Sequence, residues 1–156
     1  MKTIQRLFPV LGMALVTVLL SAPSAVRAAE RHLEARLVWA TDDSKSPNPS
    51  HKPLEGELAK KLKLMPLKYK YYFEVNRKPF DINDKEYVKV EMSQQCYIEV
   101  KDKGETRVAV KLYGENKPSK RVDSALPKGE TVAIAGDAKN GTAWLVLIYP
   151  VDSKSK

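Results

Sequence analysis

The chain has 156 residues, and 27 lysines and arginines against 19 aspartates and glutamates give it a formal net charge of +8. That length is typical of one ordinary domain with a core of its own. The single cysteine excludes an intramolecular disulfide, and two histidines with one cysteine are too few for a tetrahedral zinc site.

The first 28 residues have the pattern of a secretory signal peptide. Lys2 and Arg6 precede an apolar run over residues 7–20, and small residues then fit cleavage after Ala28. The apolar run is shorter than the roughly 20 residues of a membrane-spanning helix. We therefore expect a soluble, exported mature chain, periplasmic or extracellular, with no transmembrane span. An uncleaved signal anchor is the alternative.

The next elements are a strand, a loop and a helix. Residues 31–41 alternate between apolar and polar side chains, which predicts a half-buried strand, and the proline-rich stretch 41–53 predicts a loop. Three leucines at helical spacing predict a short helix over residues 54–64 that ends before Pro66 and closes one open end of the core. The strand is expected to turn Leu33, Ala35, Leu37 and Trp39 inward, and the helix to turn Leu54, Leu58 and Leu62.

The stretch from residue 67 to residue 76 interleaves aromatic and basic side chains. With the period of a strand, one set of alternate residues faces the core and the other faces solvent. The core set is Leu67, Tyr69, Tyr71, Phe73 and Val75, and the solvent set is Lys68, Lys70, Tyr72, Glu74 and Asn76.

The remainder of the chain predicts repeated strands. They cover residues 86–92, 94–102, 106–114, 131–136 and 142–151, with one short edge strand over 121–124 in a long polar connection. The last strand is apolar on both faces, which is typical of a central strand. We expect a mainly β fold, an antiparallel β-sandwich or small barrel of about seven or eight strands with one short helix. It forms a single domain over residues 29–150, and residues 151–156 form a disordered tail.

Catalytic and metal-binding patterns are weak. His32 and His51 fall at a strand end and in a loop, and no nucleophile elbow, zinc-protease helix or phosphate-binding glycine loop occurs in the sequence. Residues 80–87 resemble the start of a calcium loop but lack its later glycine and glutamate. Cys96 alternates with inward apolar residues, which favours a buried thiol over a nucleophile or an intermolecular disulfide. We predict no catalytic residue, no cofactor and no metal.

The segment 60–78 concentrates the positive charge. Loss of the signal peptide, which holds three bases and no acid, lowers the net charge to +5, whereas this segment holds seven bases and one acid. Localised charge favours an acidic partner, although a solvated face is the simpler interpretation. The candidate anion-binding residues are Lys60, Lys61, Lys63, Lys68, Lys70, Arg77 and Lys78, with Tyr72 as a stacking face.

The order of a short amphipathic helix, then LKYKYYFEV, then KGETVAIAGDAKNGTAWLVLIYP resembles small exported bacterial β-rich envelope proteins of unassigned role. The closing hairpin is similar to the strands that end secretin channel domains. This resemblance implies a component of an envelope assembly and supplies no site residue.

Two functions remain open, with an enzyme as a distant third. The first is a non-enzymatic binding or structural subunit of a bacterial envelope assembly that docks on a protein partner through a sheet edge or through the apolar end near the helix. The second is a module that binds an anionic polymer, such as a glycan, a cell-wall polymer or lipid headgroups, through segment 60–78. Nucleic acid is not the expected anion, because an exported protein meets the other anions more often. Salt separates the two functions, because it screens charge-driven contacts.

Overall fold

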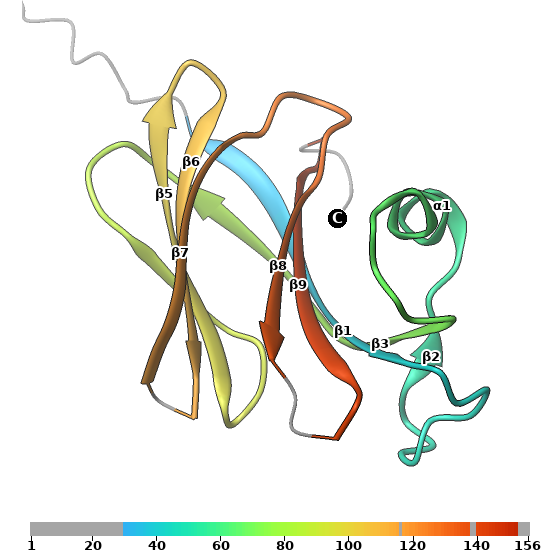
Figure 1. Cartoon of the computed structure of the whole chain (residues 1–156). Helices are drawn as coiled ribbons and strands as arrows, with labels where there is room; N and C mark the ends of the chain where they lie inside the picture. The colour runs from blue at the N-terminus through green and yellow to red at the C-terminus, as the bar shows by residue number, and fades with distance from the viewer. Residues whose placement is uncertain (1–29, 116, 138–139, 153–156) are drawn as a thin grey trace, which may run out of the picture.

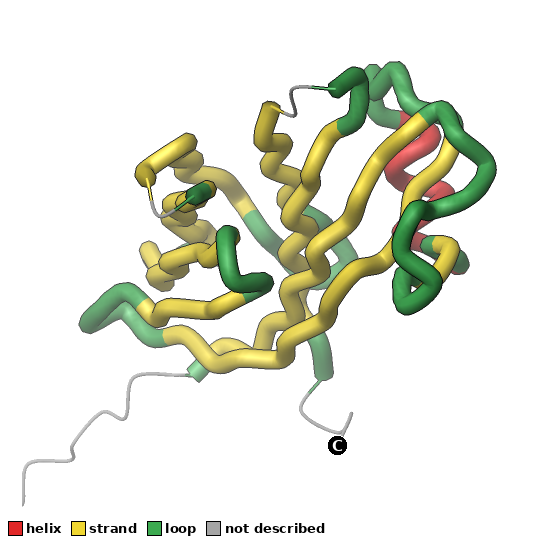
Figure 2. The backbone as a smooth tube through the Cα atoms, turned by 90° about the horizontal axis from the view of Figure 1, so that it is seen from below, coloured by secondary structure: helices red, strands yellow, loops and turns green. Residues whose placement is uncertain are grey.

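The computed structural model describes residues 30–115, 117–137 and 140–152 (Figures 1 and 2). Over these residues the chain forms nine strands in two antiparallel sheets and one helix, so the predicted mainly β sandwich is confirmed. The expected signal peptide and residues 153–156 lie outside the described residues. None of the helices described is long and apolar enough to cross a membrane.

Strand order defines the two sheets. The first has five strands, in the order β2 (Lys52–Pro53), β3 (Tyr71–Ile82), β1 (Arg31–Thr41), β9 (Ala143–Pro150) and β8 (Val132–Asp137). The second has four strands, in the order β4 (Val88–Glu91), β5 (Cys96–Gly104), β6 (Arg107–Gly114) and β7 (Lys117–Ala125).

The five-stranded sheet is covered on both faces, as the apolar pattern of β9, the final strand of the chain, predicts. Val146 and Ile148 of β9 belong to the core between the sheets. Leu145 and Leu147, which alternate with them, belong to a second core on the outer face. β9 lies between β1 and β8, so its expected central position is confirmed.

The helix α1 (Gly56–Leu64) covers that outer face (Figure 1). Its leucine stripe points to the sheet as predicted, and Leu62 is 1% exposed. The expectation that the helix closes an end of the sandwich is wrong. The second half of β1 contributes Val38 and Ala40 to this same core, so the apolar surface that needed a cover was a sheet face.

The expected orientation of Tyr71 and Tyr72 is also wrong. β3 begins only at Tyr71, whose residue surface is 41% exposed, whereas Tyr72 is 7% exposed in the core beneath the helix. Phe73 is buried as expected. Alternation separates Tyr72 from Phe73 correctly, but both faces are covered at this end of the sheet, so facing away from the main core does not mean facing solvent. It fails for Asn76, which a register shift places opposite inward Leu37, and for Leu67 and Tyr69, which precede the strand and pack in the core beneath the helix.

The connection between β6 and β8 contains a full strand, β7, where a mostly irregular segment was expected. β7 has nine residues, including Pro118 near its start. Proline is tolerated there because β7 is an edge strand and its register shifts against β6 at that position. Most β7 side chains are exposed, which explains why the sequence lacks a clear apolar alternation.

One end of the sandwich is closed by Arg31. Its guanidinium donates to Oδ1 of Asp102 at 3.0 Å, to the Arg107 carbonyl at 3.2 Å and to the Leu126 carbonyl at 2.8 Å. These bonds join β1 to both β5 and β6. Leu126, in the link between β7 and β8, is fully buried at this end. The two sheets are therefore tied together here.

Candidate functional site

The basic segment does not form one uniform charged surface. Three of its bases lie on α1, two in the link that follows, and two on β3. Lys60 pairs with Glu57 at 2.7 Å, and Lys61 donates to the Gly129 carbonyl. The other candidate lysines are exposed and form no ion pair with any described residue: Lys63, Lys68, Lys70 and Lys78.

The proposed stacking role of Tyr72 is wrong, because its ring is buried beneath α1. Burial raises the pKa of its hydroxyl. Two other tyrosines, Tyr97 and Tyr113, lie on the four-stranded sheet. Tyr97 and Tyr113 stack on each other with centroids 4.3 Å apart, so they engage one another and not an open platform beside segment 60–78.

Arg77 belongs to a compensated polar network on the five-stranded sheet. Arg36 lies 3.0 Å from both Glu34 and Glu74, and Arg77 lies 3.2 Å from Glu74 and 3.7 Å from Glu34. The hydrogen bond to Glu74 raises the pKa of Arg77. Two guanidinium groups against two carboxylates leave no net charge to attract an anion. The network holds β1 to β3 next to the helix-covered core.

Tyr149 completes this network from β9. Its hydroxyl donates to Oε1 of Glu34 and accepts a bond from Nε of Arg36 at 2.5 Å. Burial, followed by the bond to Glu34, raises the pKa of Tyr149 well above its usual range. The neutral phenol is therefore the stable form, and the group acts as a structural donor.

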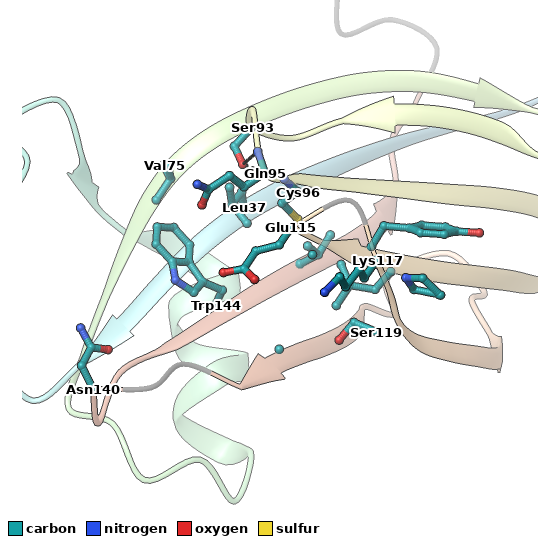
Figure 3. Close-up of a pocket in the computed structure, with 16 residues that line it drawn as sticks. Leu37, Val75, Ser93, Gln95, Cys96, Glu115, Lys117, Ser119, Asn140 and Trp144 are labelled. Carbon is teal, nitrogen blue, oxygen red and sulfur yellow. Dashed lines mark hydrogen bonds between the residues drawn. The ribbon is translucent and has the colours of Figure 1, made fainter.

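A cleft of about 650 Å³ opens between the sheets, at the end away from Arg31 (Figure 3). Binding pockets for small ligands and side chains commonly measure roughly 300–1,000 Å³ and combine apolar walls with a few polar groups. This cleft fits that description. Its walls include Leu37, Val75, Leu112 and Val146, and its exposed polar residues are Ser93, Gln95, Glu115, Lys117, Ser119 and Asn140.

Trp144 and Gly136 shape the inner wall of the cleft. Trp144 is 40% exposed, although it shares the inward face of β9 with Val146 and Ile148. Figure 3 shows its indole directed toward Leu37 and Val75. Gly136 pairs with Trp144 across the β8–β9 ladder and ends the inward series that begins with Val132 and Ile134. The missing side chain leaves the core open beside an exposed indole.

Cys96 lines the same cleft at the start of β5. It packs partly buried against the main core, as expected, and burial raises the pKa of its thiol. A thiolate is therefore disfavoured, and the residue forms part of an apolar wall. As the single cysteine of the chain, it offers a selective chemical reporter of cleft occupancy.

Both histidines have local partners. His32 lies 2.5 Å from Asp81 on the exposed surface. Nδ1 of His51 lies 2.8 Å from Oγ of Ser46, which also accepts a bond from the Asn48 amide within the same loop. Burial lowers the pKa of His51. In the described structure no carboxylate bonds to His51, so this loop does not hold the serine, histidine and carboxylate of a catalytic triad.

Other polar groups of the sequence serve as turn residues. The side chain of Asn83, in the stretch compared with a calcium loop, accepts bonds from the amides of Lys85 and Glu86. Within the described ranges, no group of three or more histidine, cysteine, aspartate or glutamate side chains could hold a metal ion.

The cleft was not predicted from the sequence. A signal for it was present in the sequence, since Gly136 has no side chain to fill an inward position of β8 and pairs with Trp144. Comparison of the chain with protein-family models, curated proteins and solved structures gives no significant match. The likeness to secretin-type strands therefore stays a prediction, and function rests on the geometry of the chain itself.

Proposed function

We propose that this protein is an exported, non-enzymatic binding subunit of a bacterial envelope assembly and that the cleft is its binding site. The observation that carries the proposal is the open, apolar end of the sandwich. A β-sandwich of this size normally fills the space between its sheets to the density of a close-packed core. Here Trp144 remains 40% exposed over a space of about 650 Å³.

Two features support this assignment. The N-terminal pattern of charge and apolar residues is that of an export signal, which favours an envelope role. The cleft combines an aromatic anchor with exposed polar groups of both signs, Glu115 and Lys117, which suits a partner with an apolar group and a polar flank.

A second candidate function is the binding of an anionic polymer or anionic lipid headgroups near the C-terminal end of α1. The observation that favours it is the exposure of Lys63, Lys68 and Lys70 together with apolar neighbours. Leu64 is 88% exposed and Tyr71 is 41% exposed. Exposed apolar groups among lysines suit an anionic surface with an apolar layer beneath it.

The test compares three full-length forms recovered from the cell envelope with their companions. They are the wild type, a cleft-filling Gly136→Val variant, and a charge-reversed variant with glutamate at positions 63, 68 and 70. If the cleft binds the partner, a defined companion survives a high-salt wash of the wild type and of the charge-reversed form, and is lost from Gly136→Val.

Circular dichroism and a urea titration first establish that each variant is folded. A companion that is equally retained by Gly136→Val contradicts the cleft as the binding site. Release of glycan or lipid by salt, together with its loss in the charge-reversed form, supports the second candidate function instead. Finding the protein in the cytoplasm would contradict the proposed envelope role.

A further inference from the structure

The four sheet edges differ in how they are protected against pairing with another chain. β2 has only two residues, one of them Pro53, and β4 is short and carries Lys89 and Glu91. β7 contains Pro118 and several bases. Short length, proline and charge are the usual devices that keep an edge from pairing. β8 has none of them over residues 132–136, whose sequence is VAIAG.

The backbone of β8 is bonded along one side only. β8 is the last strand of its sheet, and its ladder runs to β9. Among the described residues, β8 makes no hydrogen bond outside that ladder. An edge of this kind can add a further strand through main-chain hydrogen bonds.

The free edge of β8 lies beside the cleft. Gly136 of β8 and Lys117, Pro118 and Ser119 of β7 all line it. Figure 1 shows β7 and β8 nearest to each other toward the link that joins them and farther apart at the other end, where β7 begins and β8 ends. A strand added to β8 would therefore direct alternate side chains into the cleft, over Trp144, in place of the side chain that Gly136 lacks.

We propose that the occupant is an extended segment of a partner protein that pairs with β8 and inserts an apolar side chain into the cleft. This inference rests on the proposed function, because it specifies what the cleft receives. Charge narrows the chemistry of the segment. On the β7 side, Lys117 and Lys120 are exposed and have no ion pair among the described residues, whereas Arg121 and Asp123 lie 4.0 Å apart. The segment alternates apolar and polar residues and carries an acidic residue on its β7 side.

The experiment selects binding segments without assuming their sequence. A phage-displayed library of eight-residue segments is panned on the full chain recovered from the envelope, with counter-selection on Gly136→Val. The expected outcome is enrichment of alternating apolar and polar segments that hold at least one acid, with at least a tenfold loss of affinity for Gly136→Val. Absence of enrichment, or enrichment of segments without alternation, overturns the proposal.

Amide hydrogen exchange then distinguishes strand pairing from insertion of a side chain alone. The most enriched segment, made as a blocked peptide, should slow exchange in residues 132–136 at least tenfold. Two copies N-methylated at every second residue, one in each phase, keep the side chains but lose the donors of one edge. The copy methylated on the edge that faces β8 should not bind, whereas the copy methylated on the opposite edge should still bind. Equal binding by both methylated copies overturns the proposal.

Two further outcomes separate this inference from the proposed function. In the first, a peptide or an apolar dye quenches Trp144 fluorescence and protects Cys96 from alkylation, but hydrogen exchange in β8 is unchanged. The cleft then remains a binding site, and strand pairing is overturned. Protection of residues 132–136 that grows with protein concentration in the absence of peptide means that a second copy of this chain occupies the edge. That result also overturns a partner segment.

Discussion

Gly136 pairs directly with Trp144 across the β8–β9 ladder, on the face of the sheet that lines the cleft. A Cβ atom on Gly136 would meet only the Trp144 carbonyl oxygen at 3.8 Å and Cδ2 of Leu112 at 3.9 Å. Both are ordinary van der Waals distances. The glycine is therefore not required by packing, and its replacement separates stability from binding.

Gly136→Ala should raise the free energy of unfolding by about 0.4–1 kcal/mol, because alanine restricts the unfolded chain and fits the folded one. The control is Gly141→Ala, at a residue with φ of +71° and no neighbour within 4 Å of the added Cβ. That change should lower the free energy of unfolding by roughly 1–2 kcal/mol through backbone strain alone. Urea titrations measure both. Destabilisation by Gly136→Ala would show that the site cannot accept a side chain.

Tyr72→Ala should cost about 3–5 kcal/mol of unfolding free energy, since it removes a buried aromatic ring from the core beneath α1. Tyr71→Ala, at the neighbouring exposed residue, should cost less than about 1 kcal/mol. The two variants differ by one position in the sequence, so they test the orientation of β3 directly. The reverse order in denaturant unfolding would mean that the strand presents the opposite faces.

The fold could be predicted in class and in most of its strands because apolar alternation is strong where one face is buried. The same periodicity places Leu33, Leu37 and Ile98 in the main core. It was misleading for Tyr72, because alternation gives the face of a residue but not whether another layer covers that face. β7 was missed for a related reason, since an exposed edge strand buries too few side chains to leave a periodic pattern.

The candidate site was less accessible to prediction than the fold. Charge counting along the sequence joined Lys60, Lys61 and Arg77 into one basic surface. Lys60 instead pairs with Glu57 on its own helix, and Lys61 and Arg77 contact Gly129 and Glu34 from elsewhere in the chain. The cleft depends on which side chains meet across two sheets. Leu37 and Val75 of the first sheet line it together with Leu112 and Lys117 of the second, and no local pattern encodes that proximity.

Arg36→Met should lower the free energy of unfolding by roughly 2 kcal/mol, because it leaves two largely buried carboxylates, Glu34 and Glu74, with only the more exposed Arg77 as a shared cation. Arg77→Met changes the same network at a side chain that is 48% exposed, and should cost less than about 1 kcal/mol. Thermal and urea unfolding compare the two. Equal losses would contradict the view that Arg36 is the central group.

The wild-type protein should lose stability as the pH rises above about 10, the ordinary pKa of tyrosine. Burial and the Glu34 bond raise the pKa of Tyr149 in the folded state, so the folded protein holds a proton that the unfolded chain releases. Below that pH the contribution is fully present. Unfolding free energies measured at a series of alkaline pH values should fall less steeply for Tyr149→Phe. Parallel curves would contradict the assignment.

The two cores on opposite faces of the five-stranded sheet imply two levels of cooperativity. The sandwich core unites both sheets, whereas the core beneath α1 depends on one short helix whose fully buried contribution is Leu62. The helix layer should therefore open in a sub-global fluctuation while the sandwich stays folded. Such an opening would expose Val38, Ala40 and Leu147 without disturbing the cleft, so the molecule can rearrange on one side of the sheet and keep a preformed site on the other.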